Sequence, residues 1–136
     1  MDNVVTLETA KRLKQAGFPQ PEPKVGQFWY DGMFQRLSIA SHRMGKDQHL
    51  YLTPINAVDW SHYFEAVVML DDKNDWPIFA PTATDILREM PGAILVLENY
   101  GSQGKVWEVW KNGGLIADLE NPAEAAAFAW LTLNEK

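Results

Sequence analysis

The chain has 136 residues, 46% of them hydrophobic and 22% charged, and its formal net charge is −6. This length and composition predict one globular domain, residues 1–136, with a hydrophobic core. The negative charge argues against nucleic-acid binding, which depends on basic side chains that neutralise phosphates. Because there is no cysteine, the chain offers neither a disulfide framework nor a thiolate metal site.

The sequence also lacks the patterns of membrane and secreted proteins. No apolar run approaches the roughly 18 residues that a membrane-spanning helix needs. The first residues, Met1-Asp2-Asn3, contain no basic region ahead of an apolar stretch. We therefore expect a cytoplasmic protein that does not enter a membrane.

A helix is predicted from Thr6 to about Ala16, with Val5 packing at its start and Gly17 ending it. The alternating prolines of Phe18–Pro23 then impose an extended path. Strands are predicted next, at Gln27–Tyr30, Met33–Ala40 and His49–Thr53, with Asp31-Gly32 as a hairpin turn and Pro54 as a strand end.

Residues 55–76 are the least readable part of the chain. Asp59–Leu70 is typical either of a helix capped by Asp59 or of a loop followed by a strand at Ala66–Leu70. Trp76–Pro81 is a short extended approach to a helix that Thr82 caps, with Asp85 three residues on. Pro91-Gly92 ends that helix.

The C-terminal part predicts a β-meander. Ala93–Leu97 is a short apolar run typical of a strand buried on both faces. After the loop Gly101–Gly104, Lys105–Trp110 is rich in strand formers. Asn112-Gly113 then predicts a type I′ hairpin turn, since both central residues of that turn need positive φ.

This turn fixes a predicted register, in which Trp110 lies opposite Leu115, Val109 opposite Ile116, and Glu108 opposite Ala117. One face then carries Val106, Trp110, Leu115 and Ala117, and the other carries Trp107, Val109 and Ile116. Neither face is plainly polar, so we expect a sheet that is covered at least partly on both sides.

The last predicted helix runs from Pro122 to Leu133. Asn121 is its N-cap, Pro122 takes the first helical position, and Glu124 can close a capping box. The fold class is therefore α+β, with helices packed on the faces of an antiparallel sheet in an α/β/α-like sandwich. We expect that sheet to contain Ala93–Asn99, Lys105–Trp110 and Leu115–Asp118, extended by strands from Gln27–Thr53.

Three segments, Thr6–Pro23, Ala80–Leu87 and Trp107–Leu131, resemble small uncharacterised proteins of bacteria and their prophages. Trp107 and Trp110, placed before Asn121-Pro122 and an alanine-rich helix, make the C-terminal half similar to the phage ABA sandwich domain. This resemblance implies a helix–sheet–helix layering. It rests on structural residues and transfers no functional site.

No motif predicts catalysis, a metal or a cofactor. The acidic group Asp71, Asp72 and Asp75 lacks the glycine and the distal glutamate of an EF-hand loop. The spacing of His42, His49 and His62 matches no helical or strand ligand pattern. No serine lies in a G-x-S-x-G elbow.

The aromatic residues are the most unusual feature. We predict ligand- or partner-binding roles for Trp29, Trp60, Tyr63 and Trp76, because aromatic side chains in irregular segments often dominate binding. The other interpretation is that they cover the sheet as part of the core.

Three functions remain open from the sequence. The leading hypothesis is a phage- or mobile-element-type accessory protein that binds another protein without catalysis. The second is a small-molecule binder or small enzyme with a pocket lined by Trp60, Tyr63 and Trp76. The third is an immunity-type inhibitor of a basic toxin, which predicts one contiguous acidic face.

Overall fold

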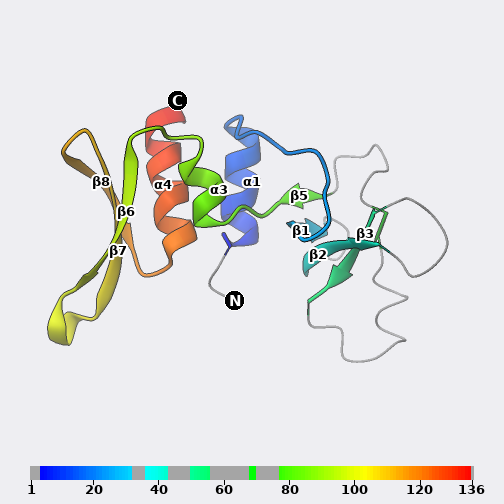
Figure 1. Ribbon diagram of the computed structural model, residues 1–136, viewed down its shortest axis with the longest axis horizontal. Helices are drawn as coiled ribbons and strands as arrows, with labels where there is room; N and C mark the ends of the chain where they lie inside the picture. Colours follow the sequence, from blue (N-terminus) through cyan, green and yellow to red (C-terminus); the bar gives the residue numbers. More distant parts are fainter. Residues whose placement is uncertain (1–3, 32–35, 43–49, 56–67, 70–76, 136) are drawn as a thin grey trace. The chain divides into compact units, whose positions relative to one another are not determined.

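The computed structural model describes residues 4–31, 36–42, 50–55, 68–69 and 77–135 (Figure 1). Its contacts divide the chain into two compact units. The first unit contains Met1–Phe18 and Pro81–Lys136, and the second contains Pro19–Ala80. The predicted single domain stays a prediction.

The second unit is built on an antiparallel sheet with the strand order β4-β3-β2-β1-β5. Its strands are β1 (Phe28–Asp31), β2 (Arg36–His42), β3 (Leu50–Pro54), β4 (Val68–Met69) and β5 (Ile78–Phe79). Strand β4 agrees with the alternative that placed a strand within Ala66–Leu70, whereas the capping residue Asp59 lies outside the described residues. Pro54 pairs with Ser38 as the last residue of β3.

The first unit has a separate antiparallel sheet of order β6-β7-β8, formed by β6 (Ala93–Asn99), β7 (Lys105–Lys111) and β8 (Gly114–Leu119). The prediction that the N-terminal strands extend this sheet is therefore wrong, because β1 to β3 pair only within the sheet of the second unit. Between β6 and β7, residues Gly101–Gln103 form one 3₁₀ turn.

The hairpin turn between β7 and β8 is confirmed. Asn112 and Gly113 have φ values of 55° and 79°, the positive values that a type I′ turn requires. Trp110 pairs with Leu115 as predicted, but a bulge follows and Ile116 is the extra residue. Val109 therefore pairs with Ala117, and Glu108 with Asp118. The predicted partners Ile116 and Ala117 are wrong by one residue.

Three helices complete the described part of the first unit, namely α1 (Leu7–Gln15), α3 (Ala83–Leu87) and α4 (Pro122–Asn134). The predicted N-caps Thr82 and Asn121 are confirmed, and Thr6, where the first helix was predicted to begin, is its N-cap. Each of these side chains accepts a hydrogen bond from a backbone N–H three residues on. The capping box of Thr82 and Asp85 is present as well.

The predicted capping box at Glu124 is wrong, because its carboxylate turns to helix α1. Thr9 Oγ1 donates to Glu124 Oε1 at 2.9 Å, and the Thr6 hydroxyl lies 3.2 Å from the same oxygen. This contact joins the first turns of α1 and α4, which are 115 residues apart in sequence. A tertiary contact has replaced the local one.

Helix α4 lies between the three-stranded sheet and the other two helices (Figure 1). It can contact neighbours on two sides because its alanines are small, and Ala123, Ala125, Ala126, Ala127 and Ala129 are all fully buried. Trp130 adds bulk at its C-terminal end, where its ring meets that of Phe18 edge to face, with centroids 5.1 Å apart.

The α+β class, with helices packed on an antiparallel sheet, is confirmed. The expectation that Ala93–Leu97 is buried on both faces is wrong, since Ile94 and Leu97 are exposed. Strand β6 is an edge strand of its sheet, and in the described part of the first unit the helices lie on one face of that sheet (Figure 1). No described helix is long and apolar enough to span a membrane.

Candidate protein interface

The candidate site is the face of the three-stranded sheet that points away from α4, which we call the outer face. Directly paired residues of neighbouring strands share a face, and the pairing Ile94–Trp110–Leu115 identifies this one because Ile94 and Leu115 are exposed. Val109 alternates to the other side and is fully buried there. The outer face consists of Ile94, Val96, Glu98, Val106, Glu108, Trp110, Leu115 and Asp118, with Tyr100 after the end of β6.

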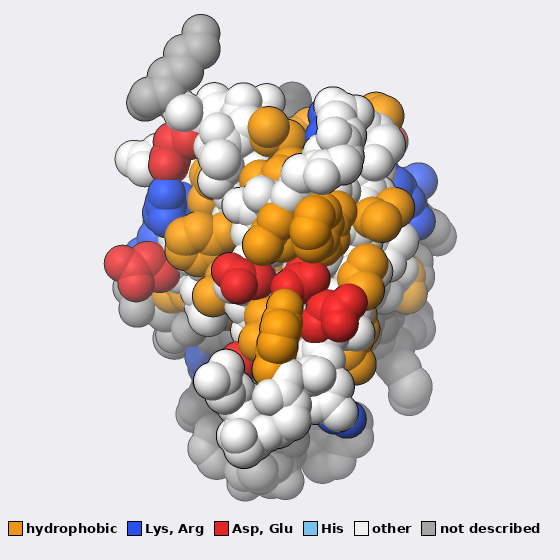
Figure 2. All heavy atoms as spheres, turned by 90° about the vertical axis from the view of Figure 1, so that its left-hand side faces the viewer, with side chains coloured by type: hydrophobic (Ala, Val, Ile, Leu, Met, Phe, Trp, Pro, Cys, Tyr) orange, Lys and Arg blue, Asp and Glu red, His pale blue; other side chains and the backbone are white. Residues whose placement is uncertain are grey.

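Hydrophobic side chains cover most of this face. Figure 2 shows them on either side of a row of acidic side chains. Ile94 is 58% exposed and Leu115 is 47% exposed, so both keep a large apolar surface in water. An exposed apolar area with polar groups around it is typical of an interaction site.

Glu108 lies near the middle of the outer face and is only 5% exposed. The phenol of Tyr100 donates a hydrogen bond to Glu108 Oε2, and the indole N–H of Trp110 donates to Oε1 at 3.0 Å. Both carboxylate oxygens are thus hydrogen-bonded, as a buried charge requires. The two aromatic rings are in turn fixed by the carboxylate between them.

The hydrogen bond to Glu108 raises the pKa of Tyr100 to about 12. Partial desolvation of the phenol and the negative charges of Glu108, Glu98 and Asp118 are the lesser causes of this same rise. The carboxylates of Glu98, Glu108 and Asp118 therefore all lie close enough to the phenol of Tyr100 to affect its ionisation. In the described part of the chain, none of the three forms an ion pair.

The bulge in β8 places Asp118 directly opposite Glu108. Like charges in this arrangement destabilise a sheet by roughly 0.2–1 kcal/mol, although exposure of Asp118 to water reduces the effect. The outer face therefore carries a local excess of negative charge within an apolar surface. A positively charged partner group would relieve this repulsion.

A hollow of about 530 Å³, which we call the edge hollow, adjoins the outer face beside β8. Apolar and acidic side chains share its wall, which is lined by Val106, Asp118, Leu119, Glu120, Asn121, Glu124 and Phe128. Glu124 Oε1 accepts hydrogen bonds from the hydroxyl groups of Thr6 and Thr9, while its buried Oε2 has no hydrogen-bond partner. The wall thus includes a carboxylate with unused hydrogen-bonding capacity.

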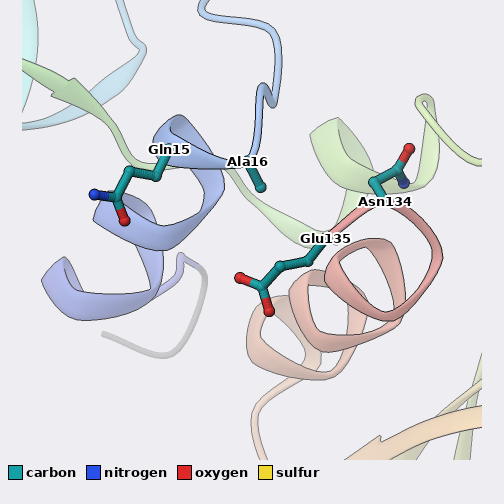
Figure 3. Close-up of a pocket in the computed structure, with 4 residues that line it drawn as sticks. All are labelled: Gln15, Ala16, Asn134 and Glu135. Carbon is teal, nitrogen blue, oxygen red and sulfur yellow. The ribbon is translucent and has the colours of Figure 1, made fainter.

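A second hollow of about 500 Å³ lies between the C-terminal ends of α1 and α4 and is lined by Gln15, Ala16, Asn134 and Glu135 (Figure 3). Two of its polar groups, those of Asn134 and Glu135, are engaged by the fold itself. Glu135 Oε1 lies 2.6 Å from Arg12 Nη2, and Asn134 Nδ2 donates to the carbonyl of Trp130 at 2.8 Å. The four residues that line this hollow do not form a pair of nucleophile and base or a set of metal ligands.

Of the predicted binding residues, the structure describes only Trp29. It is 5% exposed, packs against Phe79 with ring centroids 5.3 Å apart, and donates its indole N–H to Gln27 Oε1. Trp29 therefore belongs to the core of the second unit and offers little surface to a partner. Trp60, Tyr63 and Trp76, which were predicted to line a pocket, lie outside the described residues.

The other candidate groups are the acidic residues of 71–75 and the histidines. Asp71, Asp72 and Asp75 lie outside the described residues, as do His49 and His62. In the described ranges, no group of three or more histidine, aspartate or glutamate side chains could hold a metal ion.

Comparisons with protein-family models, with curated proteins and with solved structures each find no match to this chain. Inference about function therefore depends on the outer face and the edge hollow.

Proposed function

We propose that this chain is a non-enzymatic accessory protein, of the type carried by phages and mobile elements, that acts by binding another protein through the outer face. The phage assignment comes from the resemblance of Thr6–Pro23, Ala80–Leu87 and Trp107–Leu131. One observation carries the binding role, namely the exposed apolar surface of Ile94 and Leu115 on a sheet face that also holds a buried, hydrogen-bonded carboxylate.

The composition of the outer face supports this function. Protein interfaces are enriched in tyrosine and tryptophan relative to the rest of the surface. Tyr100 and Trp110 supply the aromatic rings, and their hydrogen bonds to Glu108 hold those rings in place before a partner arrives. Such preorganisation lowers the entropy lost on binding, because the rings are already ordered in the free protein.

Site-specific photo-crosslinking in the source cells tests this function. A benzophenone amino acid replaces Ile94 in one variant and Val25 in the other, two positions whose native side chains are both 58% exposed. Leu115 and Leu133 form a second matched pair, at 47% and 48%. We expect one discrete covalent adduct from Ile94 and from Leu115, and none from their controls.

A charge substitution completes the test. Ile94→Glu should abolish the adduct formed from position 115, because it places a charge in the apolar contact, while Val25→Glu should leave that adduct unchanged. Equal adduct patterns at all four positions, or none at any, would contradict protein binding through the outer face.

A further inference from the structure

We propose that the edge hollow receives a long cationic side chain, arginine or lysine, from the partner protein. This inference rests on the proposed function, because it names the chemistry of the partner that the outer face binds. Val106 and Asp118 belong to both the outer face and the edge hollow, so one partner surface can reach both.

The wall of the edge hollow matches both parts of such a side chain. Leu119 and Phe128 offer apolar surface to the methylene stem, and the carboxylates of Asp118, Glu120 and Glu124 can accept hydrogen bonds from the charged head. Phe128 already lies beneath one guanidinium, since Arg12 Cζ is 5.6 Å from its ring centroid. That arginine is held by Glu135.

Glu124 supplies the most specific feature. The threonine hydroxyl groups of α1 hold its Oε1, so its carboxylate is already oriented, while the buried Oε2 lacks a donor. A guanidinium or ammonium group in the edge hollow would place an opposite charge beside this oriented carboxylate.

Charge also decides between classes of occupant. A second copy placed face to face would set Glu98, Glu108 and Asp118 against the same residues, and like charges across an interface disfavour binding. Nucleic acid and anionic lipid are repelled for the same reason. A cationic protein surface is the occupant that complements these carboxylates, and it agrees with the net charge of −6.

The test is an NMR titration of the full chain with two small probes, N-acetyl-arginine amide and its citrulline analogue. Citrulline has nearly the same shape as arginine but no charge. We expect the arginine probe to shift the backbone amide signals of Asp118, Leu119 and Phe128, with the citrulline probe binding at least about tenfold more weakly. A lysine probe shows whether the bidentate guanidinium is needed.

Three variants connect the effect to the wall. Asp118→Asn and Glu120→Gln change exposed side chains and should each weaken binding of the arginine probe several-fold, whereas Glu89→Gln removes an exposed carboxylate of the region after α3 and should change nothing. Glu124→Gln should weaken binding as well. If Glu124→Gln prevents folding, the two exposed variants still decide the outcome.

Equal shifts from the arginine and citrulline probes would overturn the inference, and so would the absence of any arginine-specific shift up to the solubility limit of the probe. The inference and the proposed function fail separately. If crosslinking from Ile94 occurs while the arginine probe does not bind the unaltered chain, the outer face binds protein but the edge hollow takes no cation.

Discussion

Tyr100, which follows the end of β6, donates a hydrogen bond from its phenol to the carboxylate of Glu108 in the middle of β7. The residues lie eight positions apart, and the intervening Gly101–Gln103 turn returns the chain so that they meet on the outer face. This pairing gives the surface a spectroscopic reporter, because ionisation of a tyrosine changes its ultraviolet absorbance.

The first prediction concerns that ionisation. In an alkaline absorbance titration, Tyr100 should ionise at about pH 12, above the ordinary value of 10.0, because its phenol donates to Glu108. Tyr100→Phe should remove this high-pH transition, and Glu108→Gln should move it toward the ordinary value. The pKa is raised on folding, so the stabilising contribution of Tyr100 is complete below pH 10 and is lost as the pH rises through 12. An unchanged titration of Tyr100→Phe would show that another group gives the transition.

The second prediction concerns the hairpin turn. Gly113→Ala should destabilise the protein by about 1–2 kcal/mol, because φ at this position is +79° and a Cβ there strains the backbone although no atom lies in its way. Gly114→Ala is the matched control. Its φ is not positive, and the nearest atom to an added Cβ is the carbonyl oxygen of Lys111 at 3.7 Å. Urea denaturation should therefore separate the two variants, and equal midpoints would contradict the turn geometry.

The third prediction concerns the contact between α1 and α4. Thr9→Val keeps the shape of a buried side chain but removes the hydroxyl that donates to Glu124 at 2.9 Å. We expect a loss of about 1–3 kcal/mol in the free energy of unfolding, because a hydrogen bond to a charged group is broken. Thr84→Val, at an exposed position of α3, should change stability by less than about 0.5 kcal/mol. A denaturation curve in which both variants match the wild type would show that the contact contributes nothing.

The fourth prediction compares the two faces of the three-stranded sheet. Val109→Ala should cost about 1–3 kcal/mol, because Val109 is fully buried on the face that α4 covers. Ile94→Glu should change the free energy of unfolding by less than about 0.5 kcal/mol while it abolishes partner crosslinking, since its side chain is exposed. A large loss of stability in Ile94→Glu would mean that the outer face is part of a core.

The elements that the sequence predicted correctly are those whose signals are local. Thr82 and Asp85 cap a helix through bonds that span three residues, and Asn112-Gly113 form a turn through their own φ values. In each case a short stretch of chain contains both partners of the interaction. Residue type and spacing are then sufficient evidence.

The features that the sequence did not predict depend on residues far apart. Glu124 can close a local capping box, yet it binds threonine hydroxyl groups of α1 once the helices pack. An apolar run such as Ala93–Leu97 predicts a buried strand in both cases, whether its outer side is covered by the fold or left exposed for a partner. The signal for the outer face was already present in a hairpin without a polar face, but apolarity alone does not distinguish a core from an interface.

The bulge at Ile116 has a chemical consequence for the protein surface. Side chains alternate between the two faces of a sheet along a strand. One inserted residue therefore moves every residue beyond it to the opposite face. If Ile116 paired with Val109 and there were no bulge, Ala117 would lie opposite Glu108 on the outer face and Asp118 would point to the face that α4 covers. The acidity of the exposed sheet therefore depends on the extra residue in β8 as much as on the identity of its aspartate, because the same sequence paired without a bulge would place a neutral alanine opposite Glu108.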